Sequence, residues 1–296
     1  MGRVYSLNGA ISQAVMLLSL LGLTTGNLGM LIPFCIRICL SFSAGGRFLN
    51  RGCMLTIAVW FSCGAASAVA AKMTIDKYGK DYRVLVVNNP IKEEDEDNVR
   101  FKKDVEQWIG QSIIEAINPE FPNASICEVF DRKKYMSGVG GAPCTLMLKK
   151  MARYHFERTH EIDYHVLGFT KDEVNRHQRF IKYERSNVIP VLIDAGISKG
   201  DCFAILHDAG IKLPRVYFMG YPNANCIGCV KSSSPTYWNL VRRMHPEVFA
   251  ARAEQSRRLG CRLVKVHGER IFLDELDPRA VGGKLKSYDC GIFCDL

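Results

Sequence analysis

The chain lacks the features that mark several large classes of protein. Its 296 residues contain no internal repeat and no low-complexity stretch, which excludes solenoids, collagen-like chains and long coiled coils. No apolar run reaches the roughly 18 to 20 residues that a membrane-spanning helix needs. The composition, 48% hydrophobic and 23% charged, is instead typical of a folded globular protein.

Residues 1–53 contain no aspartate, glutamate or lysine. Four arginines are their only charged residues, and subtracting these from the formal net charge of +9 leaves +5 for the rest of the chain. The two apolar runs of this stretch are separated by Thr24-Thr25-Gly26-Asn27. We therefore expect 1–53 to be an extension outside the functional protein, which would begin at Met54, with a membrane anchor as the minor alternative.

The twelve cysteines have scattered spacings, unlike those of a disulfide-stabilised secreted domain. They indicate reduced thiols, metal ligands or catalysis, and we expect the protein in the reducing cytoplasm. The basic net charge suits an anionic small molecule such as a nucleotide as well as it suits nucleic acid, so charge alone does not choose between these ligands.

From Met54 onward, strand and helix patterns alternate. We expect strands at 56–61, 83–87, 112–117, 164–169 and 188–193, and helices at 68–77, 97–109, 145–158, 171–185 and 198–210. In the helix 145–158, a buried face would consist of Leu148, Met151, Ala152, His155 and Phe156. The alternation predicts an α/β fold with a mostly parallel sheet covered by helices on both faces.

The first candidate site is the small-residue turn after the first expected strand, Ser62-Cys63-Gly64-Ala65-Ala66-Ser67. A turn between a strand and a helix N-terminus exposes backbone N–H groups, and the helix dipole adds positive potential, so it favours phosphate or sulfate. Gly64 lets an anion approach the backbone, and Ser62 and Ser67 add hydroxyl donors. Close packing of the helix on the sheet explains the same small residues without a ligand.

The strand followed by Ser-x-Gly-x-x-Ser resembles the PP-loop of the adenine nucleotide alpha-hydrolase-like superfamily, whose usual form is Ser-Gly-Gly-x-Asp-Ser. Here Cys63 replaces the first Gly and Ala66 replaces the Asp. Three further segments, 141–150, 168–176 and 220–229, are similar to those of phosphoadenylyl-sulfate (PAPS) reductase-like proteins of bacteria and phages. The resemblance covers about 57–296. It implies a Rossmann-like fold with a nucleotide-binding core at 54–220 and a helical, basic, cysteine-bearing C-terminal region of the same domain at 221–296.

The resemblance also implies an adenine nucleotide as ligand, either PAPS, adenylyl sulfate or ATP. The residues that would bind it are Ser62, Cys63, Gly64, Ala65, Ser67, Asn88, Gly168 and Arg176. Arg176 would emerge near the carboxyl edge of the sheet, where open α/β proteins bind ligands. The alternative explanations are a solvated helix face for Arg176 and an ordinary Asn-Asn-Pro turn for Asn88.

Cysteines form the second group of candidates. Cys144 and Lys149 lie at the start of an expected helix, where the dipole and a nearby cation stabilise a thiolate, although an inert buried cysteine explains Cys144 as well. The pairs Cys226/Cys229 and Cys290/Cys294 supply four soft ligands. If the pairs converge, they would hold zinc or an iron–sulfur cluster.

Asp289-Cys290-Gly291-Ile292 resembles the C-terminal segment of PAPS reductases. That resemblance implies that Cys290 is the catalytic nucleophile, which attacks the sulfonate sulfur before a thioredoxin-like thiol donor resolves the intermediate. Phe293 stands where the family usually has His, a cationic neighbour that would lower the thiol pKa. Lys284 and Lys286 are close in sequence and are the alternative cations.

Eleven basic residues lie between Val241 and Lys286 against six acids. They form either a surface for a nucleic acid backbone, which we do not favour, or a basic outer helix face. We expect an adenine-nucleotide-binding enzyme of thiol-dependent sulfur chemistry, most simply a PAPS reductase. The alternatives are a PP-loop enzyme that thiolates or activates tRNA or DNA with a cysteine-bound metal or cluster, and a non-catalytic nucleotide-binding module with structural zinc.

Overall fold

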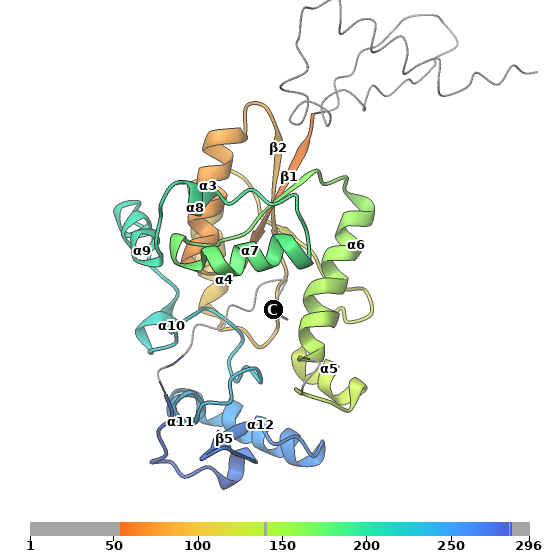
Figure 1. Cartoon of the computed structure of the whole chain (residues 1–296), viewed down its shortest axis with the longest axis vertical. Helices are drawn as coiled ribbons and strands as arrows, with labels where there is room; N and C mark the ends of the chain where they lie inside the picture. Colours follow the sequence, from red (N-terminus) through yellow and green to blue (C-terminus); the bar gives the residue numbers. More distant parts are fainter. Residues whose placement is uncertain (1–53, 139–140, 284, 286–296) are drawn as a thin grey trace, which may run out of the picture. The chain divides into compact units, whose positions relative to one another are not determined.

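The computed structural model describes residues 54–138, 141–283 and 285 (Figure 1). The described residues from Leu55 onward belong to one compact unit. The expected extension 1–53 and the two cysteines Cys290 and Cys294 lie outside the described residues. Within the described ranges, no helix has the length and apolar character needed to cross a membrane.

Four parallel strands form the central sheet: β1 (Thr56–Phe61), β2 (Arg83–Asn88), β3 (Ile114–Glu115) and β4 (Tyr164–Val166). Their spatial order is β3-β2-β1-β4, so the order of strands reverses between β1 and β4. Every residue of β1 is buried, as expected for a central parallel strand that is covered on both faces.

Helices cover both faces of this sheet. On one face, α3 (Ala65–Tyr78), α4 (Asp97–Ile109), α8 (Val191–Asp194) and α9 (Lys199–Asp208) share a hydrophobic core with Ile57 and Val59. On the other face, α6 (Met151–Thr159) and α7 (Val174–Tyr183) pack Phe156 and Phe180 with Ala58 and Trp60. The alternation of β1 side chains between the two cores follows the two-residue period of a strand. The predicted α/β fold is confirmed.

The remaining elements build a third hydrophobic core. Its contributors are α5 (Ile126–Lys133), the π-helix η2 (Thr145–Lys150), α10 (Arg215–Phe218), α11 (Pro235–Met244), α12 (Pro246–Arg258), the antiparallel pair β5 (Val264–Val266) and β6 (Glu269–Ile271), and the 3₁₀-helix η4 (Leu273–Glu275). Another 3₁₀-helix, η3 (Lys171–Glu173), precedes α7. In Figure 1, α11, α12 and β5 form a blue group apart from the sheet and its helices.

Three expected strands are wrong in extent or type. The strand expected at 164–169 covers only Tyr164–Val166. At 188–193, Val188 makes only an isolated bridge with His165, and α8 begins directly after Pro190. Proline has no N–H to donate to a strand ladder, so pairing ends there. At 112–117, only Ile114 and Glu115 pair with β2.

The expected helix 145–158 is divided into the π-helix η2 and the α-helix α6. A π-helix bonds residue i to i+5 rather than i+4, which rotates later side chains relative to a regular α-helix. As a result His155 is exposed, contrary to the predicted buried face, and Arg153 is buried in the same helix.

Candidate functional site

A cavity of about 350 Å³ lies at the carboxyl edge of the sheet. Its walls include the loop after β1, represented by Ser62 and Gly64, and the segment after β4, from Leu167 to Thr170. These two strands flank the point where the strand order reverses. Open α/β sheets bind their ligands in the crevice at this position, so the cavity is the candidate site.

The loop between β1 and α3 is held by its two serines. The Ser67 hydroxyl donates a hydrogen bond to the Gly64 carbonyl (2.9 Å) and accepts one from the Ser62 amide (3.1 Å). Gly64 is the N-cap of α3, and no side chain caps this helix. Because the first-turn amides of a helix have no partner inside the helix, they are suited to binding an anion.

Cys63, within this loop, and Asn88, at the end of β2, are not among the residues that line the cavity. The Asn88 side-chain amide donates to the Phe61 carbonyl (2.9 Å) and lies 3.7 Å from the Cys63 sulfur. Burial raises the pKa of the Cys63 thiol well above its usual value. The geometry therefore gives these two residues a bracing role at the loop, with no contact to the cavity.

Gly168 lines the cavity, but its main constraint is steric. A Cβ at this position would lie 2.8 Å from the Ser67 nitrogen and 3.0 Å from the Ala66 carbonyl carbon. Only glycine lets the end of β4 approach the first turn of α3 this closely. Gly168 therefore sets the spacing between the two walls of the cavity.

Cations and acids are balanced around the cavity. The charged lining residues are Lys149, Arg176, Lys199, Glu94, Asp172 and Glu173. Arg176 forms an ion pair with Glu173 (2.7 Å) and lies over the Phe169 ring at 5.3 Å. Attraction for an anion therefore depends on where the ammonium, guanidinium and amide groups lie, since the net charge of the lining is close to zero.

Cys144 and Lys149, paired as candidates in the sequence, lie at the N-cap and near the end of the π-helix η2. Lys149 is buried on η2 and lines the cavity. Cys144 belongs to the third hydrophobic core and is not a lining residue. A π-helix often marks a functional position, and here it brings a buried lysine to the candidate site.

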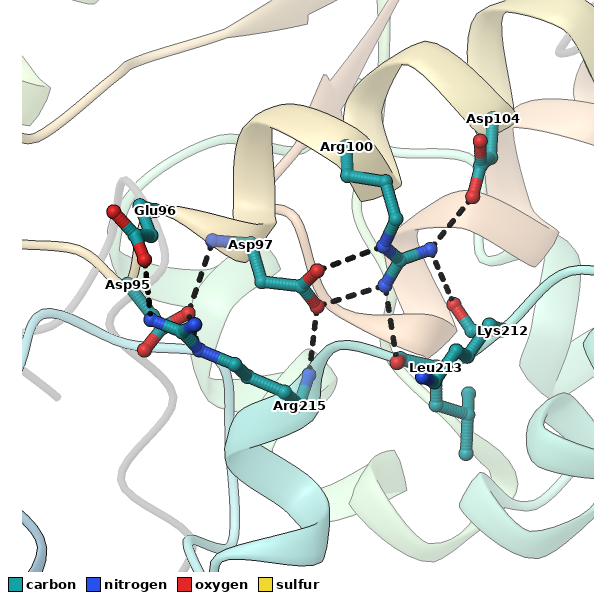
Figure 2. Close-up of polar contacts among 8 residues, drawn as sticks. All are labelled: Asp95, Glu96, Asp97, Arg100, Asp104, Lys212, Leu213 and Arg215. Carbon is teal, nitrogen blue, oxygen red and sulfur yellow. Dashed lines mark hydrogen bonds and ion pairs between the residues drawn. The ribbon is translucent and has the colours of Figure 1, made fainter.

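Tyr217 is a lining residue that sequence reasoning missed. Its hydroxyl lies 3.4 Å from the Ala65 amide, at the first turn of α3. Ala65 and Tyr217 are 152 positions apart in the sequence. No local pattern around Tyr217 indicates that it contacts the first turn of α3. The segment around α10 is instead placed by a polar network with the start of α4 (Figure 2).

In that network, the Asp97 carboxylate accepts hydrogen bonds from the Arg100 guanidinium (2.7 and 2.8 Å) and from the Arg215 amide (2.8 Å). Arg100 also donates to the carbonyls of Lys212 and Leu213, as Figure 2 shows. These contacts fasten the start of α10, and with it Tyr217, to α4.

Cys226 and Cys229 are both buried and line a second, smaller cavity of about 20 Å³. Asn223 and Asn225 line this cavity as well as the larger one. The Cys229 amide donates to the Tyr237 hydroxyl (2.7 Å), and burial raises the pKa of Tyr237. Within the described ranges, no three His, Cys, Asp or Glu side chains come together as a metal site.

Many described basic residues of the 241–286 region are engaged by other groups. Arg257 pairs with Asp274 (2.8 Å), Arg258 with Asp131 (2.9 Å) and Arg279 with Asp277 (3.2 Å), and Arg252 is buried. Paired or buried arginines attract a phosphate backbone less than open ones do. The region resembles an ion-paired surface more than an open basic patch.

No protein-family model matches the chain, and no curated protein matches it. Among solved structures, the chain is similar to the U34-tRNA thiolase NcsA from Methanococcus maripaludis with its 4Fe-4S cluster. The identity is 12% and the TM-score is 0.41, over 73% of this chain and 76% of the thiolase. The resemblance to PAPS reductases stays a prediction.

Proposed function

We propose that the chain is an adenine-nucleotide-binding enzyme of thiol-dependent sulfur chemistry, most simply a PAPS reductase. One observation carries the proposal: Asn223 and Asn225 line both the cavity at the first turn of α3 and the cavity that holds Cys226 and Cys229. The loop that we expect to bind an anion and a buried thiol pair thus share a wall. Sulfur transfer from a nucleotide needs both functions close together.

In this proposal, the first-turn amides of α3 and the Ser62 hydroxyl bind a phosphate or sulfate, and Lys149 and Arg176 add charge-assisted hydrogen bonds. The Cys290 thiolate attacks the sulfonate sulfur of PAPS. The sulfur–oxygen bond breaks, and its electron pair leaves with adenosine 3′,5′-bisphosphate. A thioredoxin-like dithiol then reduces the protein S-sulfonate, becoming a disulfide and releasing sulfite.

Thiolation of a nucleic acid is the second candidate function, and the buried Cys226/Cys229 pair favours it. Soft thiolates select zinc and iron–sulfur clusters, and these two thiols fit half of such a ligand set. Cys290 and Cys294 would have to supply the rest. A bound cluster would supply sulfur handling or electrons. If the four cysteines hold only structural zinc, the chain is the non-catalytic nucleotide-binding module.

A thermal-shift panel with ATP, PAPS and adenylyl sulfate tests the nucleotide site. Specific binding stabilises the native state by about 2.7 kcal/mol at a ligand concentration about one hundred times Kd. Gly64→Val should abolish this stabilisation, because a Cβ at Gly64 already lies 3.4 Å from the Tyr217 hydroxyl and the added methyl groups fill the space beside the amides.

Gly64 has φ −100°, so valine adds no left-handed strain and the fold should persist. Gly283→Val is the matched control, because a Cβ at Gly283 has no neighbour within 4 Å among the described residues. Equal stabilisation of both variants by nucleotide would show that the loop between β1 and α3 does not bind the nucleotide. Release of sulfite from PAPS supports the reductase, whereas a salt-dependent shift of tRNA with acid-labile sulfide in the protein supports the thiolase.

A further inference from the structure

Lys199, at the start of α9, connects the two cavities. Its ammonium donates to the Pro222 carbonyl (2.6 Å) and to the Asn223 side-chain oxygen (2.6 Å). Lys199 itself lines the larger cavity, and Asn223 lines both. One side chain therefore holds the loop 222–225, whose residues Asn223 and Asn225 form the shared wall, while its charge faces the candidate nucleotide site.

Lys199 also lies close to the proposed anion position. Its nitrogen is 5.7 Å from the centroid of the Tyr217 ring, and the Tyr217 hydroxyl is 3.4 Å from the Ala65 amide. An anionic group at the first turn of α3 would therefore lie within the reach of the flexible lysine side chain. The oxygen atoms of that anionic group would compete with Pro222 and Asn223 for hydrogen bonds from the Lys199 ammonium.

We infer that Lys199 is a positioning residue that couples nucleotide binding to the cysteine-bearing loop. Without an anion, the ammonium holds the wall in place through two neutral acceptors. A phosphate or sulfate is a stronger acceptor because the bond is then charged on both sides. The ammonium turns toward it, the wall loosens, and the cavity of Cys226 and Cys229 opens toward the nucleotide.

This inference rests on the proposed nucleotide site, so its test must report both nucleotide binding at α3 and the response of the loop 222–225. Hydrogen exchange measured by mass spectrometry does so in one sample, with ATP and PAPS added separately. Peptides covering the first turn of α3 should exchange more slowly when nucleotide binds. Peptides covering 222–230 should exchange about fivefold faster, because the loop loses a charge-assisted hydrogen bond that restrains local opening.

The variant Lys199→Met should show rapid exchange in 222–230 without nucleotide, and nucleotide should cause no further change. Lys212→Met is the control, because Lys212 is exposed and is not among the lining residues, and it should behave as the wild type does. Protection of α3 with unchanged exchange in 222–230 overturns the inference and leaves the nucleotide site intact. No protection at α3 instead rejects the nucleotide site. The wild-type comparison decides the question by itself if Lys199→Met does not fold.

Discussion

Cys63 has a left-handed backbone, with φ +55°, inside the candidate anion-binding loop. Side chains with a Cβ are strained there, and β-branched ones most of all. The PP-loop pattern that the sequence 62–67 resembles has Gly at the position of Cys63, a residue type that adopts this backbone without strain. We predict that urea unfolding gives Cys63→Val a lower free energy of unfolding than Cys63→Gly, by at least about 1 kcal/mol.

Cys202 is the matched control, because it is fully buried but lies in the middle of the α-helix α9. Glycine in a helix interior costs about 1 kcal/mol relative to alanine, and valine less. The order of the two variants should therefore reverse at Cys202. The same order at both positions would show that side-chain volume, and not the backbone angle, governs Cys63.

At the scale of elements, the contact between β4 and α3 depends on Gly168. A Cβ would come within 2.8 Å of the Ser67 nitrogen, and backbone atoms cannot yield as a flexible side chain can. Gly168→Ala should therefore lower the free energy of unfolding by about 1 to 3 kcal/mol, as overpacking does. It should also weaken nucleotide-induced stabilisation, because the first turn of α3 is displaced.

Gly200→Ala provides the comparison for Gly168→Ala. Gly200 lies in α9, where a Cβ would meet only the Ser198 hydroxyl at 3.7 Å. Alanine is the better helix former, so this change should be neutral or should stabilise the protein by up to about 1 kcal/mol. A loss of stability in Gly168→Ala no larger than that in Gly200→Ala would contradict the proposed close approach.

The brace between α4 and α10 has a pH dependence with a definite sign. Hydrogen bonds from Arg100 lower the pKa of Asp97, so the ionised carboxylate stabilises the native state. This stabilisation is present above the unfolded-state pKa of about 3.9 and is lost as pH falls below it. Asp97→Asn should cost about 1 kcal/mol at pH 7, and less as the pH falls below about 4.

Urea unfolding of both proteins between neutral pH and the acid limit of the fold measures this difference. Asp76→Asn is the control, because Asp76 forms an exposed i,i+4 ion pair with Lys72 on α3. It should change stability by less than about 0.5 kcal/mol. A cost for Asp97→Asn that does not diminish toward low pH would mean that packing, and not the ion pair, holds α10.

At the scale of the whole molecule, the sequence predicts correctly those elements whose bounds depend on residues close together in the chain. The bounds of β1 and α4 match the prediction because an apolar β-branched run and the left-handed Gly110 after α4 define them. The π-helix η2 and the loss of a strand at Pro190 change the expected pattern only slightly in sequence, but they change which side chains are buried.

The candidate site is less predictable, because distant segments build it. Ser62, Gly64 and Ser67 are recognisable as a turn in one short stretch of sequence. Tyr217 and Lys199 reach the same cavity from α10 and α9, through contacts that depend on the network at Asp97 and on the loop 222–225. No periodic pattern in the sequence indicates that Tyr217 and Lys199 lie at the same cavity, so the tertiary structure is needed to find them.

The two cysteine pairs give the prediction that separates the candidate functions. If Cys290 is the nucleophile, Cys290→Ser should eliminate turnover and spare both nucleotide binding and stability, because a serine hydroxyl is scarcely ionised at neutral pH. Cys226→Ser should then have a milder effect. Turnover of PAPS, thermal unfolding and metal analysis of the four single serine variants measure these outcomes.

If the four thiolates bind a metal instead, every one of these variants should lose metal, and stability should fall in parallel, since the free energy of metal binding becomes free energy of folding. Cys202→Ser is the matched control, because Cys202 is buried in the core that α9 shares with β1. This variant should lower stability without changing metal content. Metal loss in all four variants would overturn a purely catalytic Cys290. Unchanged metal content with turnover lost only in Cys290→Ser would exclude the shared metal site, because a tetrahedral thiolate site does not survive the loss of one ligand without a measurable loss of affinity.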